Sequence, residues 1–144
     1  MGTRRLGREL SLKVLYAYEL TQNDLGDLLE DPLFTPDGES VQFARELVWK
    51  TVEHQSDIDR EIRVKAQKWR LERIALIDRL ILRMAISELW YFDDIPPKVT
   101  INEAIEIAKK YSTEKSGQFV NGILDAVYGD MKAGETENNP ECSG

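Results

Sequence analysis

The sequence has little of the chemistry on which metal sites, disulfide scaffolds and membrane proteins depend. Its 144 residues include one cysteine and one histidine, too few for an internal disulfide or a thiol–imidazole zinc site. No apolar run approaches the ~20 residues that span a bilayer, and no apolar segment of a signal peptide follows the N-terminal arginines. These absences argue against a secreted or membrane protein, and we expect a reducing, cytoplasmic location.

Motifs for catalysis and cofactor binding are also missing. His54 lies within a helical pattern, where a lone histidine is more often a surface or packing residue than a base. The glycines of residues 117–122 have the spacing of a phosphate loop, but Ile123 stands where that loop needs lysine, and no strand precedes it. We therefore expect no enzymatic activity, no cofactor and no metal site.

Apolar residues recur at helical spacing along the chain, and no segment alternates in the way of a strand. The sequence therefore predicts an all-α fold of about seven helices. The expected helices span residues 4–22, 25–30, 38–55, 57–69, 71–92, 98–111 and 114–131, followed by a flexible tail over 132–144.

Short polar and proline motifs separate these helices. Ser56 with Asp59, and Thr100 with Glu103, have the spacing of capping boxes at helix starts. Pro96–Pro97 should end the helix before it, and residues 112–113 (Ser-Thr) should mark another break.

The segment 71–92 is apolar on most sides, which is typical of a central helix in a bundle. Asp78 and Glu88 lie among its apolar residues. A carboxylate in such a place needs a donor, so these two acids either bridge neighbouring helices or recognise a partner protein. We favour the first interpretation from the spacing alone.

Charge is distributed unevenly in a chain whose net charge is -7. Residues 1–13 carry four basic residues against one acidic, and residues 60–73 carry six against two, whereas 24–39 has six acidic residues and no basic one. Because salt screens charges over short distances, a polyanion interacts with such local patches rather than with the net charge of the chain. We interpret 60–73 as a solvated helix face and do not assign it to RNA.

The N-terminal helix has the strongest binding pattern. Arg5 and Tyr16 share one helical stripe with Glu9 and Leu12, and Arg4 and Arg8 flank it. Arginine offers a planar fork of donors to phosphate, and tyrosine offers a flat face to a base. The pattern is either an ordinary solvated charge run or a contact to single-stranded RNA.

A second candidate site lies at the start of the last expected helix. Lys115 and Gln118 carry donors suited to phosphates or bases, and Gly117 allows close approach at a helix N-terminus. Phe119 suits base stacking, although its spacing suits the core equally well.

Four segments together resemble the NusB family of transcription antitermination factors. They are Arg4-Arg-Leu-Gly-Arg-Glu9 with Leu15-Tyr16, residues 77–89, residues 95–109 and residues 115–125. Leu6 interrupts an arginine run that is often longer in the family. The resemblance covers nearly the whole chain except 24–39 and the tail.

The resemblance implies an all-helical fold of two packed subdomains, here 1–70 and 71–131, without catalytic activity. It implies binding of boxA RNA together with NusE, a small-subunit ribosomal protein, in a complex that helps RNA polymerase resist termination on ribosomal RNA operons. The implied RNA contacts are Arg4, Arg5, Arg8, Tyr16, Lys115, Gln118 and Phe119. The implied contacts to NusE are Glu72 and Asp78.

Other functions stay open at this point. The alternative to RNA binding is a helical protein-interaction adaptor without specific RNA binding. The same helical domain also occurs fused to RNA methyltransferases, but this sequence has no nucleotide-binding glycine loop. Self-association as a homodimer, which would hide the RNA face, is also open.

Overall fold

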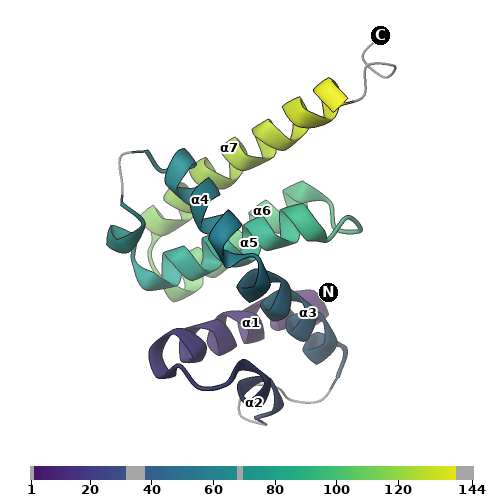
Figure 1. Cartoon of the computed structure of the whole chain (residues 1–144), viewed down its shortest axis with the longest axis vertical. Coiled ribbons are helices and arrows are strands. Elements are labelled where there is room, and N and C mark those ends of the chain that lie inside the picture. The colour runs from purple at the N-terminus through teal and green to yellow at the C-terminus, as the bar shows by residue number, and fades with distance from the viewer. Residues whose placement is uncertain (1, 32–37, 68–69, 139–144) are drawn as a thin grey trace.

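The computed structural model describes residues 2–31, 38–67 and 70–138, with side chains given for the parts of these ranges from 4 to 134. Over these residues the chain forms seven α-helices, one short 3-10 helix and no strand, which confirms the all-α prediction. The elements are α1 (Gly2–Thr21), α2 (Leu25–Glu30), α3 (Glu39–Glu53), α4 (Gln55–Lys65), η1 (Leu71–Arg73), α5 (Leu76–Tyr91), α6 (Pro97–Tyr111) and α7 (Glu114–Asn138) (Figure 1). Among the helices of these ranges, none is long and apolar enough to cross a membrane.

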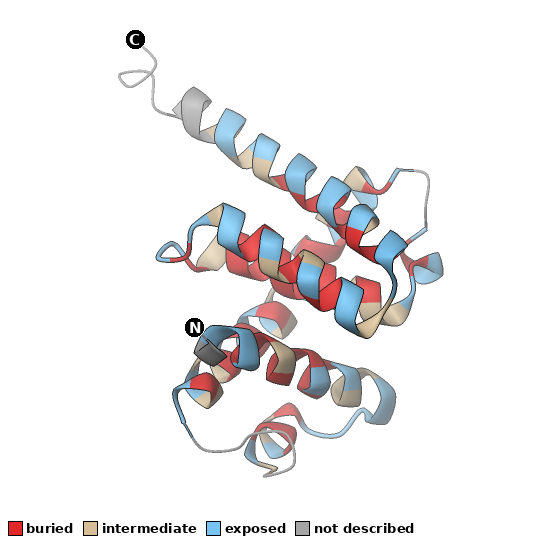
Figure 2. Ribbon diagram, turned by 180° about the vertical axis from the view of Figure 1, so that it is seen from behind, coloured by how far each residue is buried: buried red, intermediate tan, exposed pale blue. Residues whose placement is uncertain are grey.

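The helices form two groups that share α5. Helices α1, α2 and α3 lie together at one end of the molecule, and α6 and α7 pair at the other (Figure 1). Helix α5 contacts α1, α3, α4, α6 and α7, and its residues 80–89 are all buried (Figure 2). The expectation of a central helix in this segment is confirmed. Helix α4, although it lies within residues 1–70, rests mainly against α5 and α7.

Several helix ends agree with the sequence motifs. Helix α6 starts at Pro97, a position that tolerates proline because its missing N–H has no partner in the first turn. The Thr113 hydroxyl oxygen accepts a hydrogen bond from the Ser116 N–H at 3.0 Å and caps the start of α7. The break predicted at residues 112–113 is therefore confirmed.

The two predicted capping boxes are wrong. Helix α4 begins at Gln55 after His54, without a side-chain cap, and Asp59 instead accepts two hydrogen bonds from Arg83 of α5, at 2.8 and 3.1 Å. Helix α6 likewise has no side-chain cap, and Thr100 and Glu103 turn toward other helices. In both cases an acid that could have capped its own helix binds an arginine far away in the sequence.

Two predicted boundaries also differ. The segment 71–92 is not one helix, because residues 74–75 (Ile-Ala) are extended and separate η1 from α5. The side chain of Arg79 bridges this break by donating to the Leu71 carbonyl at 3.1 Å. Helix α7 continues to Asn138, so residues 132–138 of the predicted tail are helical, since no proline interrupts the hydrogen-bonded ladder there. Residues 139–144 lie outside the described residues.

Candidate nucleic-acid interface

The first two arginines of α1 lie on its exposed face, and each is paired with a carboxylate of this chain. Arg4 donates to Asp94, in the turn before α6, at 2.9 Å. Arg5 holds the Glu103 carboxylate with a two-pronged contact at 2.8 and 2.6 Å. The side chains of Arg4 and Arg5 are still 48% and 50% exposed. They are therefore accessible to a phosphate that replaces the carboxylate.

These ion pairs change the proton affinities of their members. The Arg5 guanidinium, by hydrogen bonding and charge, holds the pKa of Glu103 below its ordinary value, and Glu103 raises the pKa of Arg5. The hydrogen bond from Arg4 lowers the pKa of Asp94 in the same way. Both carboxylates are therefore ionised at neutral pH and compete with any anionic ligand.

Arg8 occupies a different environment from its two neighbours. It is only 4% exposed, and its guanidinium grips the buried Glu88 carboxylate at 2.9 and 2.6 Å. The Thr100 hydroxyl donates to the same carboxylate at 2.5 Å, and the Arg8 guanidinium also lies 5.4 Å from the centre of the Phe43 ring. This cluster joins α1, α3, α5 and α6, so Arg8 holds the helices together and does not face solvent.

Beyond these arginines, α1 lies along α6. Arg5 contacts Glu103 and Glu9 contacts Lys110, so α1 and α6 run side by side in the same direction. The first half of α1, around Glu9, therefore lies beside the last turn of α6. Tyr16 lies further along α1 and is 40% exposed, about 16 Å along the helix axis from Arg5.

Three predicted RNA-binding residues lie in the first turns of α7. Lys115 and Gln118 are exposed, and Phe119 is half-buried against the core. Phe119 lines two adjoining hollows. One, of about 340 Å³, is lined by Arg73, Ile74, Ala75, Asp78, Lys115, Ser116 and Phe119. The other, of about 330 Å³, is lined by Lys65, Ala66, Gln67, Gln118, Phe119, Gly122 and Ile123.

The two residues predicted to contact a partner protein differ in accessibility. Glu72 is exposed on η1. Asp78 is only 8% exposed, and one of its carboxylate oxygens accepts a hydrogen bond from the Ser116 hydroxyl at 2.9 Å. This bond ties the start of α5 to the start of α7. Glu72 is therefore available to a partner, whereas Asp78 supports the shape of the first hollow.

Arg73 is not among the predicted site residues, because the charge pattern places it in a solvated stretch. It belongs to η1, and only the fold brings it to the hollow that Lys115 and Phe119 line. No sequence spacing links the two elements. No group of three or more histidine, cysteine, aspartate or glutamate residues that could hold a metal ion occurs within the described ranges.

The comparisons with known proteins agree on one family. The model of the NusB family matches residues 5–129. A transcription antitermination protein NusB of Chloroherpeton thalassium is 46% identical over 136 residues, which are 91% of this chain; the chain spans 64% of that relative's length. A solved structure of T. maritima NusB has a TM-score of 0.79 and 42% identity, covering 86% of this chain and 89% of that one. A crystal structure of antitermination factors NusB and NusE in complex with double-stranded RNA also has a TM-score of 0.79, with 28% identity over 90% of this chain and 98% of that one.

Proposed function

Because the chain belongs to the NusB family, we propose that it is a transcription antitermination factor that binds boxA RNA together with NusE. In this role it joins the complex that helps RNA polymerase resist termination on nascent ribosomal RNA transcripts. The observation that supports the proposal most directly is the similarity, over nearly the whole chain, to a NusB structure that contains both NusE and RNA. The proposed activity is binding rather than catalysis.

The proposed RNA contacts are the predicted residues that the fold leaves accessible. They are Arg4, Arg5, Tyr16, Lys115, Gln118 and Phe119. They occur along one side of α1 and at the start of α7, and two ion pairs join the first half of α1 to α6, the helix that leads into α7. Arg8, which the resemblance also implied as a contact, is assigned to positioning α1 because its guanidinium is buried against Glu88.

Binding at the arginines is an exchange of one anion for another. A phosphate can accept the same fork of donors from Arg5 that Glu103 accepts in the free protein. The gain from the phosphate is reduced by the loss of the internal pair. NusE, proposed to contact Glu72, would compensate by adding its own surface to the RNA-binding track.

The experiment is fluorescence anisotropy of a labelled boxA RNA and a scrambled RNA of the same length, with and without NusE, over a salt series. We expect selective binding of boxA that NusE strengthens and that weakens as salt rises, because phosphate contacts release counterions. Arg5→Gln and Tyr16→Ala test the two ends of the α1 face, because the second removes the ring on which a base would stack. Arg60→Gln is the matched control, because Arg60 is exposed and, among the described residues, forms a salt bridge only with Asp57 of its own helix.

The opposite outcome has a defined meaning. Equal or absent binding to the two RNAs, with NusE still captured, would reject boxA recognition and support the interaction-adaptor alternative.

A further inference from the structure

A hollow of about 510 Å³ lies between the outer face of α3 and the C-terminal end of α5, apart from the RNA contacts proposed above. Three exposed side chains at helical spacing on α3 line it: Glu46, Trp49 and Glu53. Trp49 is 48% exposed, and its ring makes no aromatic or cation contact within the described part of the chain. A half-exposed indole beside a hollow is typical of a surface that a partner covers.

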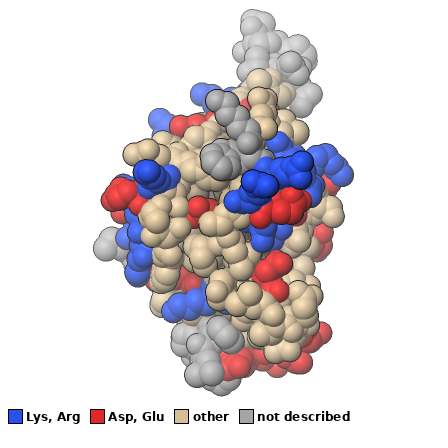
Figure 3. All heavy atoms as spheres, turned by 90° about the vertical axis from the view of Figure 1, so that its left-hand side faces the viewer, with Lys and Arg blue, Asp and Glu red and all other residues tan. Residues whose placement is uncertain are grey.

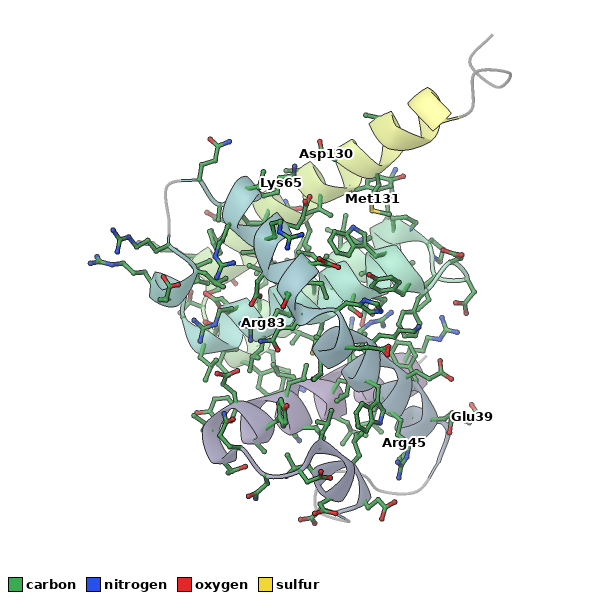
Figure 4. The ribbon with its side chains drawn as sticks, viewed as in Figure 1. Glu39, Arg45, Lys65, Arg83, Asp130 and Met131 are labelled. Carbon is green, nitrogen blue, oxygen red and sulfur yellow. The ribbon has the colours of Figure 1, made fainter. Side chains whose placement is uncertain are left out.

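The two cations that line the hollow are both directed toward partners within the chain. The Lys50 ammonium lies 5.6 Å from the centre of the Tyr91 ring. Arg45 reaches from α3 toward α2 and donates to the Leu29 carbonyl at 3.4 Å (Figure 4). These cations are therefore less available to a ligand than their number implies.

The glutamates of the hollow, in contrast, have no lysine or arginine within salt-bridge distance among the described residues. The nearest cationic group to Glu53 is the neighbouring His54, whose Nε2 atom lies 3.8 Å from its carboxylate. Glu46 and Glu53 are seven positions apart, or ~10 Å along the helix axis, with Trp49 between them. The available charge in the hollow is thus negative, and it flanks an open aromatic face.

We propose that this hollow is a docking site for an arginine-bearing segment of a partner protein. One guanidinium stacks on the Trp49 indole, and basic side chains of the segment bind Glu46 and Glu53. A guanidinium is planar and weakly hydrated, so it can lie on an aromatic ring and donate to a carboxylate at the same time. An extended segment rises ~3.3 Å per residue, so basic residues three positions apart span the ~10 Å between the two glutamates.

The hollow adjoins the proposed RNA site but not the proposed NusE contact. Asp94, the partner of Arg4, also lines the hollow, so the docked segment would lie beside RNA held at Arg4 and Arg5. Glu72 precedes the start of α5, whereas the hollow lies at the end of this helix of 16 residues, ~24 Å away along its axis. The segment and NusE can therefore bind at the same time.

The sign of the available charge favours a basic protein segment over RNA as the ligand. A polyanion would meet Glu46 and Glu53 without an equal number of available cations to offset them. Cations gather on a different surface. On the side shown in Figure 3, which is the left-hand side of Figure 1 with η1 and the turn between α6 and α7, Lys and Arg side chains lie at the edges of a largely uncharged area. That side would repel a basic segment, whereas the α3 hollow attracts it.

The test uses fluorescein-labelled hexa-arginine as the probe, with hexalysine and hexaglutamate for comparison, titrated with the full chain in the absence of RNA. We expect anisotropy to show that hexa-arginine binds more tightly than hexalysine, because only the guanidinium stacks well, and that hexaglutamate does not bind. In proton–nitrogen NMR spectra, the indole N–H signal that Trp49→Leu lacks should shift as hexa-arginine is added.

Two variants test the hollow after circular dichroism has shown native helicity. Trp49→Leu keeps an apolar side chain but loses the aromatic face, so it should weaken hexa-arginine binding about two- to fivefold. Glu46→Gln/Glu53→Gln should weaken it about five- to tenfold through the loss of two exposed ion pairs. The matched control is Glu30→Gln/Glu39→Gln, the same change of net charge at exposed glutamates that do not line the hollow, with an expected effect within about twofold.

Each outcome decides the proposal. A shift of the Trp49 signal, together with weaker binding by both hollow variants than by the control, supports it. If the hollow variants bind hexa-arginine as the control does, the peptide responds to net charge alone and the proposal is wrong. If Trp49→Leu instead weakens binding of boxA RNA, or abolishes a dimer detected by light scattering, the surface serves RNA or a second copy and the proposal is equally wrong. The proposed function fails separately, if the unaltered protein with NusE binds no boxA RNA.

Discussion

Substitutions of Arg8 and Glu88 should reduce the stability of the fold without reducing RNA binding, which distinguishes an arginine that stabilises the fold from one that binds RNA. Their side chains are only 5% and 2% exposed, and two charge-assisted hydrogen bonds join them. Removing one partner of such a buried pair leaves an uncompensated charge and typically costs ~3–5 kcal/mol. The whole domain should be stable by roughly 7–20 kcal/mol, from about 0.05–0.15 kcal/mol per residue. Arg8→Met and Glu88→Leu should therefore each fold at 25 °C, with a large loss of stability.

The double variant shows whether the loss comes from the unpaired charge. Arg8→Met/Glu88→Leu leaves neither charge in the core, so its cost should be well below the sum of the two single costs, with a coupling of about 2 kcal/mol or more. The Thr100 hydroxyl, which donates to Glu88, loses its partner and keeps the double variant below the unaltered protein by about 1 kcal/mol. Urea unfolding followed by circular dichroism measures all four proteins.

RNA binding of the same variants completes the test. In the folded state Arg8→Met should bind boxA RNA with NusE within about twofold of the unaltered protein, whereas Arg5→Gln should bind roughly fivefold more weakly. Strict additivity of the stability losses, or a folded Arg8→Met that loses as much RNA affinity as Arg5→Gln, would refute the reasoning from burial.

Three other predictions concern the same helices. Glu103→Gln removes the anion that competes for Arg5, so its affinity for boxA RNA should rise about two- to fivefold in the anisotropy assay at low salt. Because Arg5 lowers the pKa of Glu103 from its ordinary 4.5, the pair stabilises the fold above that pH and loses its effect as pH falls through the lowered pKa. Acid titration followed by circular dichroism should therefore show stability falling over this pH range. Arg5→Gln should make that fall smaller. Gly7→Ala places a Cβ atom 2.8 Å from the Phe43 ring and 3.0 Å from the Ser40 carbonyl oxygen, so it should cost ~1–3 kcal/mol in urea unfolding, and an unchanged midpoint would contradict the tight crossing of α1 and α3.

The helices themselves could be predicted because their signals are local. The apolar spacing within each segment, the prolines before α6 and the Ser-Thr break before α7 lie within a few residues of the structures that they specify. The central place of α5 followed from its largely apolar surface, since a helix that is apolar on most sides has to be covered on most sides.

The hydrogen-bond partners of the acidic side chains could not be predicted in the same way. Asp59 and Glu103 have the spacing of N-terminal caps, and sequence alone favours the near partner. In the fold, each meets an arginine from another helix, Arg83 and Arg5, with two hydrogen bonds to the carboxylate. Two charge-assisted bonds to a carboxylate are stronger than one bond from a backbone N–H at a helix start. The two helix starts therefore have no side-chain cap, because these acids bind arginines of other helices instead.

The same comparison of partners shows why an arginine-rich segment is an incomplete guide to a binding surface. A chain with a net charge of -7 has more carboxylates than cations, so the default for an arginine is an internal partner. Arg8 pairs with a carboxylate in the core, and Arg4 and Arg5 pair with carboxylates at the surface. Other exposed cations, such as Lys13, Arg73 and Lys98, have no carboxylate within salt-bridge distance among the described residues. A phosphate can bind a cation of this kind without first breaking an ion pair, so such cations, rather than the most arginine-rich segment, should give the larger gain for each phosphate that binds.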